Sequence, residues 1–314
     1  MTLPGMFNGL NEIKTLHRYR SLGFGFVSLT VGNDSIWDPR TILERLAVVR
    51  AAVAADPESF QIVGSASDVR LAKDHGKLAI SFHLQGTNGL GGNVAWVERF
   101  FSLGITHMLL AYNSRNAVGD GCAELADAGL SRYGRSVVQE MNRVGMLVDG
   151  SHTGYRTTME AIGLSTKPFV FTHANAARIF DHYRNIRDDQ IVACAKTGGV
   201  IGINGVGAFL SPTGEVSAEL LYRHVDHMSQ LVGPAHVGLG LDFVENVAKF
   251  VSMAADSADT WPSNAGQPLR FEHFAGPEIV APLVDLLCAH GYRDEHVRGI
   301  LGENFFRVFQ QNVG

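Results

Sequence analysis

The chain has 314 residues, 46% of them hydrophobic, and a formal net charge of −5. It lacks a basic stripe with interleaved aromatic residues, a secretory-type apolar run near its start, and any stretch of roughly 18 apolar residues. We therefore expect neither nucleic acid nor a membrane as partner. The three cysteines are odd in number and form no CxxC pair, which favours a reducing, cytoplasmic location over a disulfide framework.

Short apolar runs recur along the chain and predict eight strands. The runs are apolar throughout rather than alternating, as expected for parallel strands that are buried on both faces. In chain order they cover residues 3–10, 23–31, 77–85, 106–113, 145–151, 168–173, 198–205 and 236–243.

Amphipathic segments between these runs predict helices. They begin at serine or end at glycine in several cases, and they cover residues 40–55, 93–104, 131–145 and 217–233. Strands that alternate with helices predict an α/β fold, a (β/α)8 TIM barrel formed by residues 1–314 as a single domain. Segments 208–216 and 246–275 are loop-like, and we expect them over the mouth of the barrel.

Polar side chains follow most of the predicted strands. In a barrel the active site lies at the carboxyl ends of the strands, so these side chains are the candidate functional groups. They are His83, Gln85, Tyr112, Asn113, His152, His173, Asn204 and Asp242.

Two successive strands end on a histidine, His152 and His173. Because adjacent strands lie about 4.8 Å apart, the two imidazoles can meet at one divalent ion, and imidazole suits zinc. Asp242 could then accept a proton from a water molecule whose pKa the zinc lowers to about 7. The alternatives stay open: each histidine can be a hydrogen-bonded polar group, Asp242 can cap the next helix, and His83 can be a core histidine.

The motifs around these residues resemble a known family. They are "GLSRYGRSVVQEMNRVGMLVDGSHTG", "FVFTHANAARIFDHYRNIRDDQI", "TGGVIGING", "HVGLGLDF" and "ILGENFFRVF", and with them residues 78–314 are similar to the renal (membrane) dipeptidases, peptidase family M19 of the amidohydrolase superfamily. The resemblance implies a barrel of the metal-dependent hydrolase type that cleaves dipeptides with two zinc ions, and a homodimer. It implies zinc ligation by His152 and His173, proton acceptance by Asp242, and binding of a substrate carboxylate by Arg184. A structural salt bridge is the alternative for Arg184.

The sequence departs from the family pattern at three places. In "NGLNE", residues 8–12, Leu10 stands where the family has a metal-binding histidine, and Glu12 is the only candidate replacement for an aspartate ligand. Gln85 replaces a bridging glutamate and is a weak ligand, because a neutral amide bridges two cations poorly. Tyr112 replaces a histidine that contacts substrate. These changes resemble a bacterial branch of the family and predict one zinc ion, with two not excluded.

His83 lies on the same strand face as Gln85 and could supply a third ligand beside His152 and His173, since three histidines with one open position form a known catalytic zinc site. The alternative is that His83 hydrogen-bonds near the site. The resulting prediction is a hydrolase that cleaves a dipeptide or a related N-acyl amino acid with a free carboxylate, with Arg184, Tyr112 and Asn204 in substrate binding. A non-hydrolytic enzyme or a metal-free binding protein on the same scaffold is the alternative.

Overall fold

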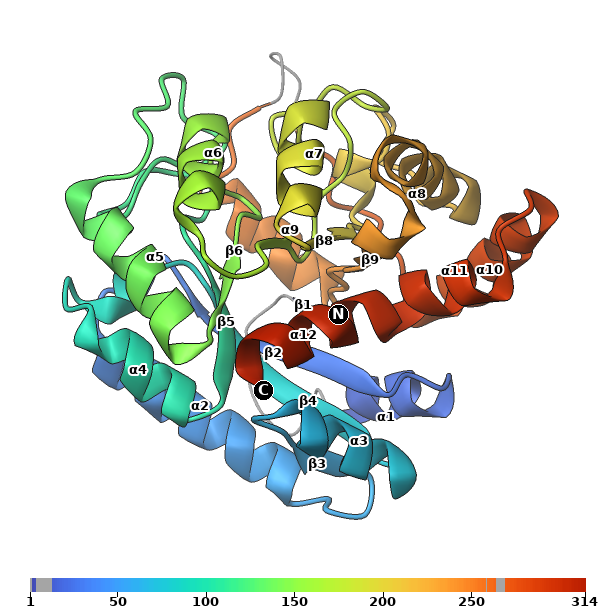
Figure 1. The fold of residues 1–314 in the computed structure, drawn as a ribbon, viewed down its shortest axis with the longest axis horizontal. Helices are drawn as coiled ribbons and strands as arrows, with labels where there is room; N and C mark the ends of the chain where they lie inside the picture. The colour runs from blue at the N-terminus through green and yellow to red at the C-terminus, as the bar shows by residue number, and fades with distance from the viewer. Residues whose placement is uncertain (1, 4–12, 258, 264–268) are drawn as a thin grey trace.

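The computed structural model describes residues 2–3, 13–257, 259–263 and 269–314. Eight parallel strands follow one another around a curled sheet, with helices on its outside (Figure 1). In sheet order the strands are β1 (Thr2–Leu3), β2 (Phe26–Asn33), β4 (Leu78–Gln85), β5 (Ile105–Leu109), β6 (Leu147–Asp149), β7 (Val170–Phe171), β8 (Val200–Ile203) and β9 (Val237–Leu239). The predicted parallel α/β fold is confirmed. Most of the predicted first strand, residues 4–10, lies outside the described residues.

One short strand was missing from the prediction. β3 (Phe60–Ile62) pairs with the first half of β4, and β5 pairs with the second half of β4. Three residues with a central glutamine are too short to show a periodic pattern, so only pairing with β4 identifies this strand.

The four predicted helices are confirmed to within two residues at each end. They are α2 (Pro39–Ala54), α4 (Ala95–Ser102), α5 (Arg132–Val144) and α8 (Ala218–Val232). The serines recognised as start signals cap α5 and α8, because Ser131 accepts a hydrogen bond from the Gly134 amide and Ser217 accepts one from the Leu220 amide.

The prediction that 246–275 is a loop was wrong in part. Residues Val247–Ala255 form helix α9, and the side chain of Asn246 caps it by accepting a hydrogen bond from the Lys249 amide. This segment is apolar around nearly its whole circumference, so it lacks the polar face that marks a surface helix in sequence. The remaining helices are α1 (Ile13–Ser21), α3 (Ala66–Asp74), α6 (Tyr155–Leu164), α7 (Asp188–Lys196), α10 (Val280–Ala289), α11 (Asp294–Arg298) and α12 (Asn304–Val313).

Helix α12 covers the amino-terminal end of the sheet (Figure 1). Its Val308 and Phe309 are buried in one apolar cluster with Leu147, Val170 and Val200, the first residues of β6, β7 and β8. Because this end is closed by apolar packing, the polar side chains collect at the opposite, carboxyl end of the strands.

Two glycines allow the backbone to pass close to the strand end that carries His173. A Cβ atom on Gly240 or on Gly202 would overlap the carbonyl oxygen of Thr172. We expect Gly240→Ala to destabilise the protein by about 1–3 kcal/mol or more, because the overlapping atom belongs to the backbone and has no side-chain freedom to move away. Thermal denaturation measures the effect. Gly163→Ala, inside α6 with open space at the Cβ position, is the matched control and should be neutral or stabilising.

Candidate metal centre

Three residues at the carboxyl ends of the strands have an unusual backbone conformation. Among the described residues, only three non-glycine residues have a positive φ: Asn113 at 61°, His152 at 63° and Asp242 at 57°. Asn113 follows β5, His152 follows β6 and Asp242 follows β9. Strained backbone of this kind persists where the surroundings hold it and often marks functional sites. All three residues were singled out from the sequence as strand ends.

His152, His173 and Asp242 converge on one point. Their ligand atoms all lie within 4.8 Å of one another, and all three residues are buried. The two imidazole rings have centroids 5.0 Å apart, and Nε2 of His173 lies 4.0 Å from Oδ1 of Asp242. Three protein groups at this spacing can surround one metal ion.

Buried polar atoms without hydrogen-bond partners show whether a cation fits this group. Nε2 of His152 and Oδ1 of Asp242 are buried and have no hydrogen-bond partner among the described residues. A buried polar atom without a partner is costly, so each such atom calls for an explanation. Two lone pairs that face the same point beside a second imidazole fit a divalent metal ion. The predicted His152–His173 pair is thus brought together, and Asp242 joins it as a third candidate ligand.

Hydrogen bonds behind the group orient each side chain. Nδ1 of His152 lies 2.7 Å from Oδ1 of Asn113, and Nδ1 of His173 lies 2.8 Å from Oγ1 of Thr172. The Thr172 hydroxyl in turn donates to the buried carboxylate of Asp149. These contacts leave both Nε2 atoms directed at the shared point, as metal-binding histidines require.

Burial also sets the protonation of these groups. It lowers the pKa of both His152 and His173 well below the ordinary value, aided by the positive charge of Arg184, so both imidazoles are neutral. Burial raises the pKa of Asp242 to about 7, although Arg184 and a hydrogen bond from Asn204 to Oδ2 act in the opposite direction. Neutral imidazoles are the form that binds metal.

Arg184 lies buried beside this group, and no carboxylate among the described residues pairs with it. Its Nη2 donates to the carbonyl oxygen of His173 at 3.4 Å, and the guanidinium carbon lies 5.1 Å from the centre of the Phe209 ring. Its Nε has no hydrogen-bond partner among the described residues. Within the same residues, the Arg184 guanidinium forms no salt bridge with an acidic side chain. The structural salt bridge considered as its alternative is therefore not seen in the described part of the chain. A buried guanidinium with a free N–H group and no carboxylate partner among the described residues is suited to an anionic ligand.

Aromatic side chains cover His152. Tyr112 stacks on its ring with centroids 4.1 Å apart, and Trp261 meets both rings edge-on, at 5.6 Å from Tyr112 and 5.7 Å from His152. The sequence prediction included Tyr112 and missed Trp261. Trp261 lies in a segment predicted as loop. Only the presence of a large aromatic residue in that segment could have indicated a role at the site.

Of the three remaining candidate ligands, the structure describes His83 and Gln85. His83 is fully buried, with Nδ1 2.9 Å from Ser28 Oγ and Nε2 2.7 Å from Thr30 Oγ1, and its ring stacks on His107. With both ring nitrogens engaged, His83 fits the alternative in which it hydrogen-bonds without ligating. Gln85 is buried at the end of β4, and its Nε2 has no hydrogen-bond partner among the described residues. Glu12 lies outside the described residues.

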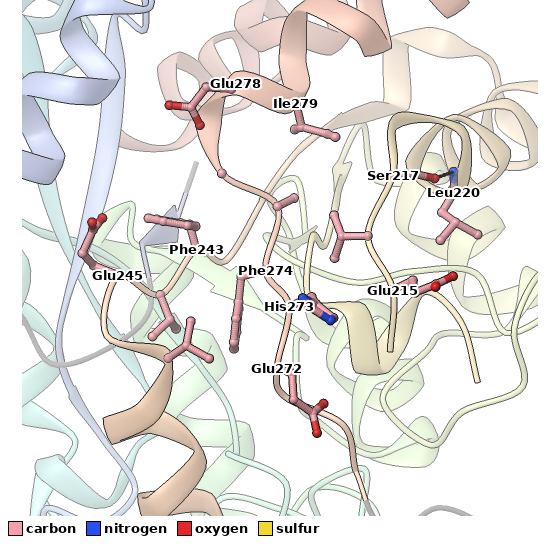
Figure 2. Close-up of a pocket in the computed structure, with 15 residues that line it drawn as sticks. Glu215, Ser217, Leu220, Phe243, Glu245, Glu272, His273, Phe274, Glu278 and Ile279 are labelled. Carbon is pink, nitrogen blue, oxygen red and sulfur yellow. Dashed lines mark hydrogen bonds between the residues drawn. The ribbon is translucent and has the colours of Figure 1, made fainter. Parts of the chain in front are cut away.

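A separate hollow of about 720 Å³ lies beside the site (Figure 2). Figure 2 shows Phe243 and Phe274 near its centre, with glutamates around them. Two of these glutamates, Glu245 and Glu278, form salt bridges with Arg18 of α1. None of the three candidate metal ligands lines this hollow, although Phe243 directly follows Asp242. The metal centre is therefore distinct from it.

A parallel α/β barrel with two neutral histidines and an aspartate at the carboxyl ends of its strands defines the class of metal-dependent hydrolase barrels. The chain belongs to the membrane dipeptidase family (Peptidase family M19), whose model matches residues 20–260.

Known relatives agree with this assignment. An uncharacterized dipeptidase of Schizosaccharomyces pombe is 28% identical over 279 residues, which cover 87% of this chain and 62% of that protein. The crystal structure of an amidohydrolase from Pseudomonas aeruginosa superposes with a TM-score of 0.87 at 25% identity, covering 100% of this chain and 94% of the other. The fold is thus the predicted barrel of the amidohydrolase type.

A third relative carries a ligand. A metallo peptidase from Rhodobacter sphaeroides, liganded with a phosphinate mimic of the dipeptide L-Ala-D-Ala, has the same fold with a TM-score of 0.78 at 22% identity, covering 95% of this chain and 89% of the other. Among the described residues, no helix of this chain is long and apolar enough to cross a membrane.

Proposed function

We propose that this protein is a zinc-dependent dipeptidase, which hydrolyses the amide bond of a dipeptide or a related N-acyl amino acid with a free carboxylate. The observation that carries the proposal is the convergence of His152, His173 and Asp242 beside the buried guanidinium of Arg184, whose Nε has no hydrogen-bond partner among the described residues. Support comes from the family, and from the related metallo peptidase that holds a dipeptide mimic.

Each side chain has a role that its surroundings allow. His152 and His173 would hold the ion through Nε2, and Asp242 Oδ1 faces the same point. A bound zinc ion supplies Lewis acidity, which activates water and polarises a carbonyl group. Asp242 Oδ1 accepts the proton of the attacking water, while Asn204 holds Oδ2 at 3.2 Å. Tyr112 and Trp261 limit the access of bulk water from the His152 side.

We propose that one zinc ion binds per chain. A second ion would need further carboxylate ligands, and the candidate position nearest to the family pattern is the neutral amide of Gln85. Elemental mass spectrometry of the purified protein, before and after zinc reconstitution, should give about one zinc per chain. Two zinc ions per chain would restore the two-ion mechanism of the family. No zinc under either condition would exclude the proposed chemistry.

The activity itself is tested with the zinc-loaded protein and a library of dipeptides and N-acyl amino acids, with product masses as the readout. Hydrolysis adds one water to the summed mass of the products, whereas isomerisation changes no mass. Absence of any product across the library would sink the dipeptidase proposal. The alternative of a metal-free binding protein leaves the unsatisfied Nε2 of His152 and Oδ1 of Asp242 unexplained.

Arg184→Ala should raise KM for a dipeptide by about 10- to 100-fold. The reason is that hydrogen bonds to a charged group contribute about 1.5–3 kcal/mol and would be lost. Steady-state kinetics measure the effect. Arg187→Ala is the matched control, because Arg187 is exposed three residues away and its guanidinium contacts Tyr155. A KM that rises equally in both variants would contradict the role given to Arg184.

A further inference from the structure

Asn113 occupies a position where its backbone alone would favour glycine. Its φ of 61° lies in the left-handed region, which glycine adopts without strain. The surroundings hold it there: the Asn113 amide donates to the carbonyl oxygen of His152 at 3.2 Å, and the Ala123 amide donates to the carbonyl oxygen of Asn113 at 2.9 Å. An asparagine at such a position calls for an explanation by its side chain.

The side chain of Asn113 reaches His152 from behind. Its Oδ1 lies 2.7 Å from Nδ1 of His152 and also accepts a hydrogen bond from the Cys122 thiol at 3.3 Å. An amide oxygen can only accept hydrogen bonds, so Nδ1 of His152 must carry the proton. A neutral imidazole with its proton on Nδ1 has a free lone pair on Nε2, the atom that faces His173 and Asp242.

We propose that Asn113 is a positioning residue, which fixes the tautomer and ring orientation of His152 and so makes Nε2 available as a metal ligand. This inference rests on the proposed metal centre. In this role Asn113 acts on the centre through His152. Partners of this kind behind metal-binding histidines change metal affinity about 10- to 100-fold when they are removed.

The two histidines of the centre have different partners behind them. His173 is linked through Thr172 to the carboxylate of Asp149, whereas His152 is held by a neutral amide. The chain therefore fixes both tautomers and places an acidic side chain behind His173 but not behind His152. The loss of Asn113 should affect His152 and leave the His173 side unchanged.

Two substitutions distinguish the role of the Asn113 side chain as hydrogen-bond acceptor from the role of its backbone conformation. Asn113→Gly relieves the backbone strain and removes the acceptor, whereas Asn113→Asp keeps an acceptor and tolerates the same φ. Zinc affinity is measured by competition with a chelator. We expect Asn113→Gly to bind zinc about 10- to 100-fold more weakly than the parent, and Asn113→Asp to bind at least as tightly as the parent.

A second measurement uses the metal-free protein labelled with ¹⁵N at histidine. In the parent, nuclear magnetic resonance should show His152 protonated on Nδ1, with the signal assigned from its absence in His152→Ala. In Asn113→Gly, His152 should shift toward the other tautomer, while His173 should not change. Thermal melting of the Gly variant shows whether the fold is kept.

The outcomes separate this inference from the proposed function. If Asn113→Gly keeps both the Nδ1 tautomer and the zinc affinity of the parent, Asn113 has only a backbone role and the inference is overturned. Equal losses in the Gly and Asp variants would overturn it as well. If the parent binds no zinc, yet His152 loses its Nδ1 tautomer in the Gly variant alone, the proposed function fails and the positioning by Asn113 stands.

Discussion

Asp242→Asn is expected to lower kcat by roughly 10²–10⁴-fold, the range that general acid–base groups contribute. Asparagine has the same shape and tolerates the φ of 57° at this position, but it cannot accept the proton of the attacking water. Steady-state kinetics of the zinc-loaded variant, with zinc content measured on the same sample, test the prediction. Activity near that of the parent would remove Asp242 from the reaction.

Heat stability of the metal-free protein provides a readout of this variant that does not depend on activity. The pKa of Asp242 is raised from 3.8 to about 7 in the folded protein. The folded parent therefore holds a proton that the unfolded chain releases, and the stability this contributes is lost as the pH rises from 3.8 to about 7. Asparagine does not ionise, so the metal-free variant should melt higher than the metal-free parent at pH 8. The difference should shrink toward pH 4.

His152→Ala is expected to lower zinc affinity by more than about 100-fold, because loss of a ligand should exceed the effect of losing a partner behind a ligand. Zinc content after dialysis should fall from about one per chain to near zero. The substitution also removes the ring on which Tyr112 stacks, so thermal melting must accompany the metal measurement.

His236→Ala is the control for His152→Ala. His236 is a histidine that precedes β9, at the amino-terminal end of that strand, where its Nδ1 lies 2.8 Å from the carbonyl oxygen of Gly199. This variant should keep its zinc. If His152→Ala retains full zinc content while it is folded, the ion binds elsewhere and the centre formed by His152, His173 and Asp242 is refuted.

The sequence by itself determined the order of the elements and the location of the candidate chemistry. Buried parallel strands are apolar throughout, and their ends are marked by the first polar residues, so His152, His173 and Asp242 could be identified from local pattern alone. Helices with a clear polar face and a capping serine, such as α5 and α8, were predicted for the same local reason. Family motifs added Arg184, which no periodicity indicates.

Only the tertiary structure decided which of these residues meet. β3 exists because it pairs with β4, and Trp261 covers His152 because its segment folds back over the strand ends. His83 and His173 share the pattern of a histidine near a strand end, yet Ser28 and Thr30 on the neighbouring strand engage both nitrogens of His83. The hydrogen bond from His152 to Asn113 joins residues 39 positions apart. Contacts of this kind depend on the register and curvature of the sheet, which local sequence patterns do not encode.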